Sequence, residues 1–205
     1  MRTPQVVKKS GMTLVELLVS VALFTLLMLV VTNGIQQMYL YNAYTFAQAY
    51  QVQNARLGMQ ALIRDVREMT FADNGTFPLA VMNEHEIGFY SDIDRDDSVE
   101  YVTFGYAGST TIVKSIFNAT GSPPVYDTSS PDEVITLSRF VQNDLQATST
   151  FFYFDTDGLP VTNSNNITDV RYIESQIIVN IDPIRDPGQF MLRSSAALRN
   201  IKENL

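Results

Sequence analysis

Hydrophobic residues are distributed unevenly along this chain of 205 residues, and their spacing changes twice. Residues 12–31 are almost continuously apolar and include one charged residue, Glu16. Between residues 55 and 69 the apolar positions recur every three or four residues, and after Pro78 they alternate with polar positions over short runs. These patterns are typical, in turn, of a membrane-spanning helix, of a helix packed on a core and of β-strands.

One helix is predicted to run from Thr13 to Thr70, because no Pro occurs between Thr13 and Pro78. The tripeptide Thr-Asn-Gly at residues 32–34 combines three poor helix formers, which together permit bending or local melting at the end of the apolar span. Residues 36–54 are rich in Gln, Asn and Tyr. This composition fits helix-to-helix packing at the periphery of an assembly, and it fits an exposed stalk equally well.

The last part of this helix is predicted to dock on a sheet, because it is amphipathic. The predicted core-facing stripe consists of Ala55, Met59, Leu62, Ile63, Val66 and Met69, whereas Arg56, Gln60, Arg64, Arg67 and Glu68 occupy the other faces. We expect the cluster of Arg64, Asp65, Arg67 and Glu68 to form a solvated face, with an i,i+4 ion pair between Arg64 and Glu68.

The alternating runs after Pro78 predict antiparallel strands. Residues 86–93 and 99–106 flank an acidic turn and should form a hairpin. Further strands are expected at residues 111–117, 134–141, 150–154, 170–180 and 190–198, between turns rich in Gly, Pro and Asp. Because one helix precedes only strands, the predicted fold class is α+β, with a long N-terminal helix whose second half packs on an antiparallel β-sheet.

Composition argues against several classes of function. The chain has no Cys and one His, which excludes disulfides and thiolate sites and gives no basis for a His-dependent triad or a multi-His zinc site. The formal net charge of −8 argues against a nucleic-acid groove built on positive charge, unless Arg171, Arg185, Arg193 and Arg199 cluster. The sequence has no phosphate-binding loop and no nucleophile elbow, and we expect no enzymatic activity.

Positive charge precedes the apolar span, because Arg2, Lys8 and Lys9 lie within the first eleven residues, which contain no acid. This asymmetry predicts a cytoplasmic N-terminus and a C-terminal part across the membrane. Without these three of its 14 basic residues, a chain starting at Met12 has 11 basic against 22 acidic residues, a net charge of −11. Glu16 would cost about 2.5–3.5 kcal/mol at the centre of a span, which an ordinary anchor does not explain. Residues 30–36 offer only a poor cleavage site for a secretory signal.

The hexapeptide Gly-Met-Thr-Leu-Val-Glu at residues 11–16 follows Lys8-Lys9 and leads into the apolar span. It resembles the class III signal of type IV pilins and pseudopilins, although Met12 stands where Phe is commonest. The resemblance implies that a prepilin peptidase cleaves between Gly11 and Met12 on the cytoplasmic side of the membrane and that Met12 is then N-methylated. The implied parts are a cleaved leader at 1–11, a transmembrane and assembly helix at 12–34, a helix continuation docking on the sheet at 35–70 and a β-rich globular domain at 71–205.

Cleavage would give Met12 a free amine about one helical turn from the Glu16 carboxylate. Neither charge is stable alone in hydrocarbon, because loss of one partner from a buried pair costs about 3–5 kcal/mol. Glu16 is therefore expected to pair with an amine. The amine of a neighbouring subunit would set the axial register of an assembly, and the amine of the same chain is the alternative.

Three further segments narrow the resemblance. Residues 56–68, the turn at 91–94 and residues 196–200 are similar to minor pilins of the PilW kind and to J-type pseudopilins. Such proteins assemble in small number at or near the tip of a type IV pilus or a type II secretion pseudopilus and help to start polymerisation. The implied partners are other pilin or pseudopilin subunits, the prepilin peptidase, an assembly platform protein and membrane lipid, with no nucleic acid.

The resemblance also implies a location. The protein is expected to cross the inner (cytoplasmic) membrane once, with its globular domain periplasmic or otherwise extracytoplasmic, and to enter the filament on assembly. The alternative function is a membrane-tethered binding module at the tip, such as an adhesin or a DNA-uptake component. A tip subunit could perform both roles.

One acidic segment is a candidate calcium site. Its carboxylates belong to Asp92, Asp94, Asp96, Asp97 and Glu100. The first three stand at positions 1, 3 and 5 of a calcium-loop pattern and Glu100 at position 9, but Asp97 replaces the usual Gly and Thr103 occupies the chelating twelfth position. A solvated turn is the alternative, because Asp favours turns for backbone reasons alone. No other cofactor is expected.

Overall fold

The helix α1 (Leu14–Arg67) is the first element of the computed structural model, which describes residues 11–96, 98–185 and 188–198. The chain forms two compact units, residues 1–46 and 47–205. In the first unit every side chain from residue 11 to residue 43 is exposed. The helix continues without interruption through Thr32, Asn33 and Gly34, so the local melting that this tripeptide permits does not occur in the structure.

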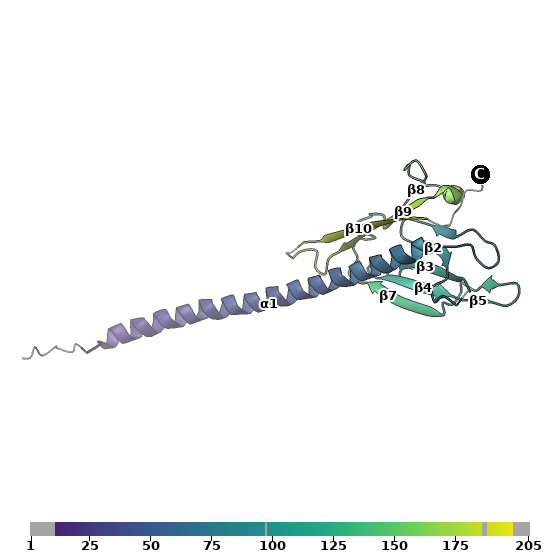
Figure 1. The fold of residues 1–205 in the computed structure, drawn as a ribbon. Coiled ribbons are helices and arrows are strands. Elements are labelled where there is room, and N and C mark those ends of the chain that lie inside the picture. Colours follow the sequence, from purple (N-terminus) through teal and green to yellow (C-terminus); the bar gives the residue numbers. More distant parts are fainter. Residues whose placement is uncertain (1–10, 97, 186–187, 199–205) are drawn as a thin grey trace, which may run out of the picture. The chain divides into compact units, whose positions relative to one another are not determined.

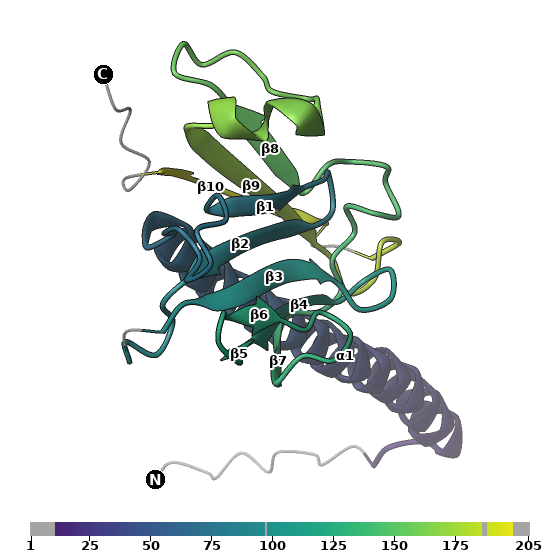
Figure 2. The same cartoon turned by 90° about the vertical axis from the view of Figure 1, so that its right-hand side faces the viewer.

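In the second unit the rest of α1 is followed by antiparallel strands (Figure 1). The strands are β1 (Leu79–Met82), β2 (Ile87–Ser91), β3 (Glu100–Tyr106), β4 (Ile112–Phe117), β5 (Ala119–Thr120), β6 (Val125–Tyr126), β7 (Glu133–Ser138), β8 (Phe151–Phe154), β9 (Tyr172–Val179) and β10 (Phe190–Ala197), with a 3-10 helix, η1 (Ser164–Asp169), before β9. They form a five-stranded sheet of order β1-β2-β3-β4-β7, a three-stranded sheet of order β10-β9-β8 and a ribbon of β5 and β6 (Figure 2). This arrangement confirms the α+β class.

The C-terminal part of α1 docks on these sheets through the predicted stripe. All six stripe residues are buried and belong to one core cluster. The same cluster includes Phe89 and Phe104 from the five-stranded sheet and Ile173 from the three-stranded sheet. Gly58 allows α1 to approach β7 closely, because a Cβ at this position would lie 2.9 Å from Leu137 Cβ.

All five residues of strand β2 are buried, and two clusters of side chains cover its two faces. Phe89 belongs to the core cluster under α1, whereas Tyr90 belongs to a second cluster that also contains Tyr101. Tyr126 of β6 packs against this second cluster, and its hydroxyl donates to the carbonyl of Val99 at 2.8 Å. The small ribbon therefore covers part of the sheet face opposite α1.

The end of α1 differs from the prediction. The helix ends at Arg67 rather than at Thr70, because the chain joins the sheet at once. Met69 pairs with Ser91, and the amide of Thr70 donates to the carbonyl of Tyr90 at 2.9 Å.

The strand predicted at residues 134–141 is also shorter, since β7 ends at Ser138. Phe140 has a positive φ of 59°, which turns the chain out of the strand, and Val141 pairs with Val179 of the other sheet. The four-residue strand β1 and the two-residue strands β5 and β6 were not apparent from the sequence pattern. The pattern predicts one sheet, and the structure divides the strands between two larger sheets and the ribbon.

The predicted ion pair between Arg64 and Glu68 is wrong. Asp65 lies on the buried side of α1. Its carboxylate contacts Lys114 of β4 at 2.8 Å and Arg64 at 3.2 Å. Glu68 instead contacts Arg95, in the turn after β2, at 3.4 Å. Two acidic residues of the segment expected to be a solvated face, Asp65 and Glu68, thus form ion pairs with residues of the five-stranded sheet and of its β2–β3 turn.

Candidate functional site

The N-terminus of α1 is capped by reciprocal hydrogen bonds between Thr13 and Glu16. The amide and the hydroxyl of Thr13 donate to Glu16 Oε2 at 2.8 and 3.0 Å, and the amide of Glu16 donates to Thr13 Oγ1 at 3.3 Å. Thr13 immediately precedes the helix and Glu16 is its third residue, so the arrangement is a capping box. The start of the helix is thereby fixed three residues after Gly11.

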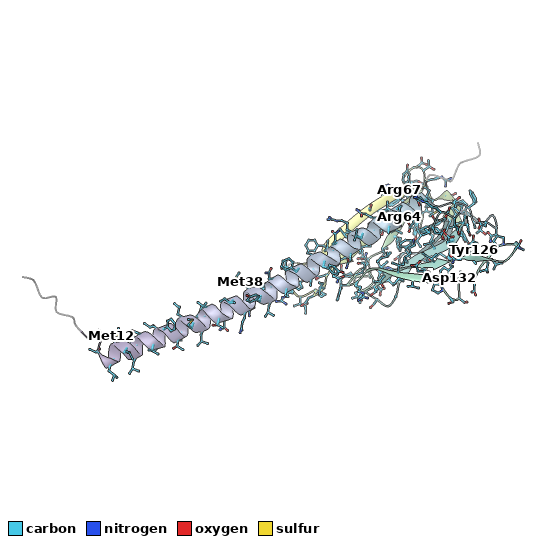
Figure 3. The ribbon with its side chains drawn as sticks, turned by 60° about the horizontal axis from the view of Figure 1, so that its bottom comes forward. Met12, Met38, Arg64, Arg67, Tyr126 and Asp132 are labelled. Atoms are coloured by element: carbon cyan, nitrogen blue, oxygen red, sulfur yellow. The ribbon has the colours of Figure 1, made fainter. Side chains whose placement is uncertain are left out.

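This geometry places the Glu16 carboxylate beside the predicted cleavage point. Gly11 and Met12 are exposed and lie outside the helix, Met12 with 69% of its surface accessible (Figure 3). Glu16 Oε2 accepts from the amide of Thr13, the residue directly after Met12. Hydrolysis of the Gly11–Met12 peptide bond would therefore create an amine one residue from the atoms that Glu16 already contacts.

Gly11, Met12 and Glu16 were apparent from the sequence, whereas the role of Thr13 was not. The missed signal is the spacing Thr-x-x-Glu, which marks the start of a helix when an apolar run follows. Glu16 has a structural role in its own chain before any cleavage, in addition to the charge pairing predicted for it. The two roles use the same side chain and have to be separated by experiment.

The apolar part of α1 satisfies its own hydroxyl groups. Ser20, Thr25 and Thr32 donate to the backbone carbonyls four residues earlier at 2.7, 2.7 and 2.8 Å. Hydrocarbon requires this arrangement, because it offers no water to an unpaired donor. By length and composition, α1 could cross a membrane. The basic residues Arg2, Lys8 and Lys9 of the leader lie outside the described residues.

The acidic turn between β2 and β3 brings three of the five predicted metal ligands together. One carboxylate oxygen from each of Asp92, Asp94 and Glu100 lies within 4.8 Å of the other two. Asp96 is not part of this group, and its Oδ1 accepts from the amide of Ser98 at 2.9 Å. Asp97 lies outside the described residues.

Two of these carboxylates also hold the turn in shape. Asp92 Oδ1 accepts from the amide of Arg95 at 2.6 Å, and Glu100 Oε2 accepts from the amide of Ile93 at 2.8 Å. Burial raises the pKa of Glu100 above its ordinary value, and the surrounding carboxylates raise it further. A cation would offset this repulsion, and Ca²⁺ prefers oxygen ligands of this kind. Calcium binding stays a prediction.

The arginines that could have formed a nucleic-acid surface are spread along the β9–β10 hairpin. Arg171 directly precedes β9 and Arg185 follows its other end, so the length of the strand separates them. Arg193 is engaged with Glu174 at 3.0 Å. Arg199 lies outside the described residues. The three described arginines therefore form no cluster.

In comparisons with known proteins, residues 7–32 match the family described as prokaryotic N-terminal methylation motif. The match includes Gly11, Met12 and Glu16 and ends inside the apolar part of α1. The chain thus carries the type IV pilin-like prepilin signal, attached to a long apolar helix. Comparisons with curated proteins and with solved structures give no match.

Proposed function

We propose that this protein is a structural subunit of a filament, a pilin or pseudopilin that a prepilin peptidase cleaves between Gly11 and Met12. The processed chain is then drawn from the membrane into a type IV pilus or a type II secretion pseudopilus. The observation that carries this proposal is the methylation motif, placed at the start of a capped helix that satisfies its own hydroxyls. Such a helix is compatible with lipid and with other helices around it. The proposed role is not enzymatic.

Glu16 is proposed to direct assembly by pairing with the amine of a neighbouring subunit. The capping box uses Oε2, and Oε1 takes part in no hydrogen bond of the described residues. The side chain is exposed, so this second oxygen is accessible to a partner. A charge pair in apolar surroundings fixes the axial position of one helix against the next, because a displaced helix leaves both charges unpaired.

We further propose a minor subunit, PilW-like or J-type, that lies at or near the tip and helps to start assembly. The similarity of residues 56–68, 91–94 and 196–200 supports this finer proposal. Before assembly the protein would lie in the inner membrane with its N-terminus cytoplasmic, as the basic leader supports. Its proposed partners are the prepilin peptidase, other filament subunits and the assembly platform protein.

The test is to express the full chain in cells with and without an active prepilin peptidase and to measure the mass of the membrane-embedded form. We expect a product that begins at N-methylated Met12 only when the peptidase is active. Gly11→Val is the matched control, because a Cβ at residue 11 meets nothing within 4 Å and leaves the chain's own packing unchanged. A wild-type chain that keeps its leader in the presence of the peptidase would overturn the proposal.

A second measurement addresses the role in the cell. Deletion of the protein should abolish or shorten the filaments. Intact filaments that have lost adhesion or DNA uptake would instead support the alternative, a membrane-tethered binding module at the tip.

A further inference from the structure

The exposed side of α1 in the second unit carries a line of positive charge that core packing does not use. Arg56, Gln60, Arg64 and Arg67 follow one another at spacings of four, four and three residues, which places them on one side of the helix. All four are exposed, and together we call them the arginine face (Figure 3 labels Arg64 and Arg67). The face is about 17 Å long.

Most of this charge is not neutralised within the described part of the chain. Arg56 and Arg67 take part in none of its ion pairs. Arg64 contacts Asp65 at 3.2 Å, but the same carboxylate contacts Lys114 at 2.8 Å, so one anion serves two cations. A protein with a net charge of −8 therefore displays a positive surface on its longest helix.

A groove runs beside the arginine face. It has a volume of about 430 Å³, and its lining consists of Gln60, Ile63, Arg64, Arg67 and Glu68 of α1 and Ser194 of β10. Guanidinium, amide and hydroxyl groups thus line one cavity, next to the apolar side chain of Ile63 and the Glu68 carboxylate, which already contacts Arg95 at 3.4 Å. Guanidinium groups bind carboxylates through paired N–H donors, so the chemistry of this groove suits Asp or Glu side chains.

We propose that the arginine face and its groove bind the carboxylate-bearing surface of a neighbouring filament subunit. The inference rests on the proposed function, which supplies such a neighbour. Charge complementarity selects the occupant, because filament subunits of acidic composition, such as this chain, present more carboxylates than cations. A nucleic acid fits less well, because duplex DNA carries about one negative charge per 1.7 Å of its axis, so the net negative charge of this chain repels it more strongly than it repels a protein surface with a few carboxylates.

The position of the arginine face fits a contact that repeats. It lies on the side of α1, whereas exposed carboxylates of this chain also occur on other elements, for example Asp157 in the turn after β8 and Asp169 in η1. A contact between two different surfaces of successive subunits is heterologous, and such contacts build rings or open filaments rather than symmetric pairs.

The test uses the full-length chain in cells that assemble the filament. A photo-crosslinking amino acid replaces Gln60 in the groove and, as a control, the exposed turn residue Ser130. We expect an adduct with a second filament subunit from position 60, with Asp or Glu in the linked peptide. Position 130 should not give this adduct. A nucleic-acid adduct, or no adduct from position 60, would overturn the inference.

Charge reversal tests the mechanism. Arg67→Glu should lower the adduct yield about tenfold or more, because it replaces attraction by repulsion. Arg139→Glu is the matched control, since Arg139 is also exposed and takes part in none of the ion pairs of the described residues. Arg67→Lys should keep most of the yield. In the presence of Arg67→Glu, replacing the acid of the linked peptide by a basic residue should restore the adduct.

The outcomes separate this inference from the proposed function. If Arg67→Glu and Arg139→Glu give equal yields at equal thermal stability, the docking surface is wrong although the filament role stands. If the wild-type chain is neither processed nor recovered from sheared filaments, the proposed function is wrong.

Discussion

Asp65 Oδ2 lies 2.8 Å from Lys114 Nζ, and the two side chains expose only 2% and 5% of their surfaces. The pair joins α1 to β4 across 49 positions of sequence. Asp65 Oδ1 also contacts Arg64 at 3.2 Å, whereas no other carboxylate of the described residues pairs with Lys114. The two partners are therefore not equivalent, because Asp65 keeps a cation when Lys114 is removed.

Asp65→Asn is expected to destabilise the globular unit by about 3–5 kcal/mol, because it leaves the buried Lys114 cation unpaired. Lys114→Met should cost less, since Asp65 retains Arg64. The double variant should be more stable than Asp65→Asn alone. Denaturant unfolding of the full chain in detergent, followed by tyrosine fluorescence, measures all three. Strictly additive effects would show that the two side chains are not coupled.

Thr13→Ala and Glu16→Gln should separate the capping role of Glu16 from its charge. Gln at this position still completes a capping box but carries no charge, whereas Thr13→Ala removes the cap and keeps the carboxylate. If charge pairing sets the register, Glu16→Gln loses filament recruitment and Thr13→Ala keeps it. Recovery of each processed variant from sheared filaments is the measurement. The reverse result would assign the effect to capping.

Gly58→Ala is expected to destabilise the protein, and Gly34→Ala is its matched control. Ala in a helix is favoured over Gly by about 1 kcal/mol, but overpacking costs about 1–3 kcal/mol. A Cβ at residue 58 would lie 2.9 Å from Leu137 Cβ, whereas at residue 34 it would meet nothing within 4 Å. The thermal transition of the globular unit should fall for Gly58→Ala alone. An unchanged transition would mean that β7 can move away at little cost.

Glu100→Gln is expected to stabilise the globular unit at neutral pH. Burial, followed by the carboxylates of Asp94, Asp92 and Asp96, raises the pKa of Glu100 above the ordinary value of 4.5. The folded chain therefore holds this proton more tightly than the unfolded chain does. Relative to the variant, the wild type should lose stability as the pH rises from that value to the raised pKa, and no further above it. A stability difference that does not change with pH would contradict this.

Calcium should raise the unfolding temperature of the wild type and not that of Glu100→Gln. Binding to the folded state stabilises it in proportion to the logarithm of the ion concentration. Asp96→Asn is the control that should still respond, because Asp96 lies outside the group formed by Asp92, Asp94 and Glu100. If millimolar calcium leaves the wild-type transition in place, the acidic turn is a hydrogen-bonded turn and not a metal site.

Features that depend on local spacing could be predicted from the sequence. The apolar stripe of α1 is buried as expected, and each predicted strand segment contains a strand. Their ends differ where a distant partner decides, as at Met69, which leaves the helix to pair with Ser91. The short strand β1 has too few residues for a periodic pattern.

Contacts between distant segments could not be predicted in this way. Asp65 lies in a segment rich in charge, and nothing near it in sequence reveals Lys114 as its partner. The split into two sheets depends on the turn at Phe140. In the acidic turn, spacing indicated the carboxylates, but the bond from Ser98 that engages Asp96 required the structure. The capping role of Thr13, in contrast, was missed although its spacing to Glu16 carries a local signal for it.

The inward-directed hydroxyls of Ser20, Thr25 and Thr32 have a consequence for the proposed life of the subunit. At these positions no polar contact is broken or made when lipid is exchanged for neighbouring helices. The free energy of moving this segment from the bilayer into the filament, or back again, then depends mainly on the charged end of the segment. A subunit released from a disassembling filament could return to the bilayer undamaged and be used again.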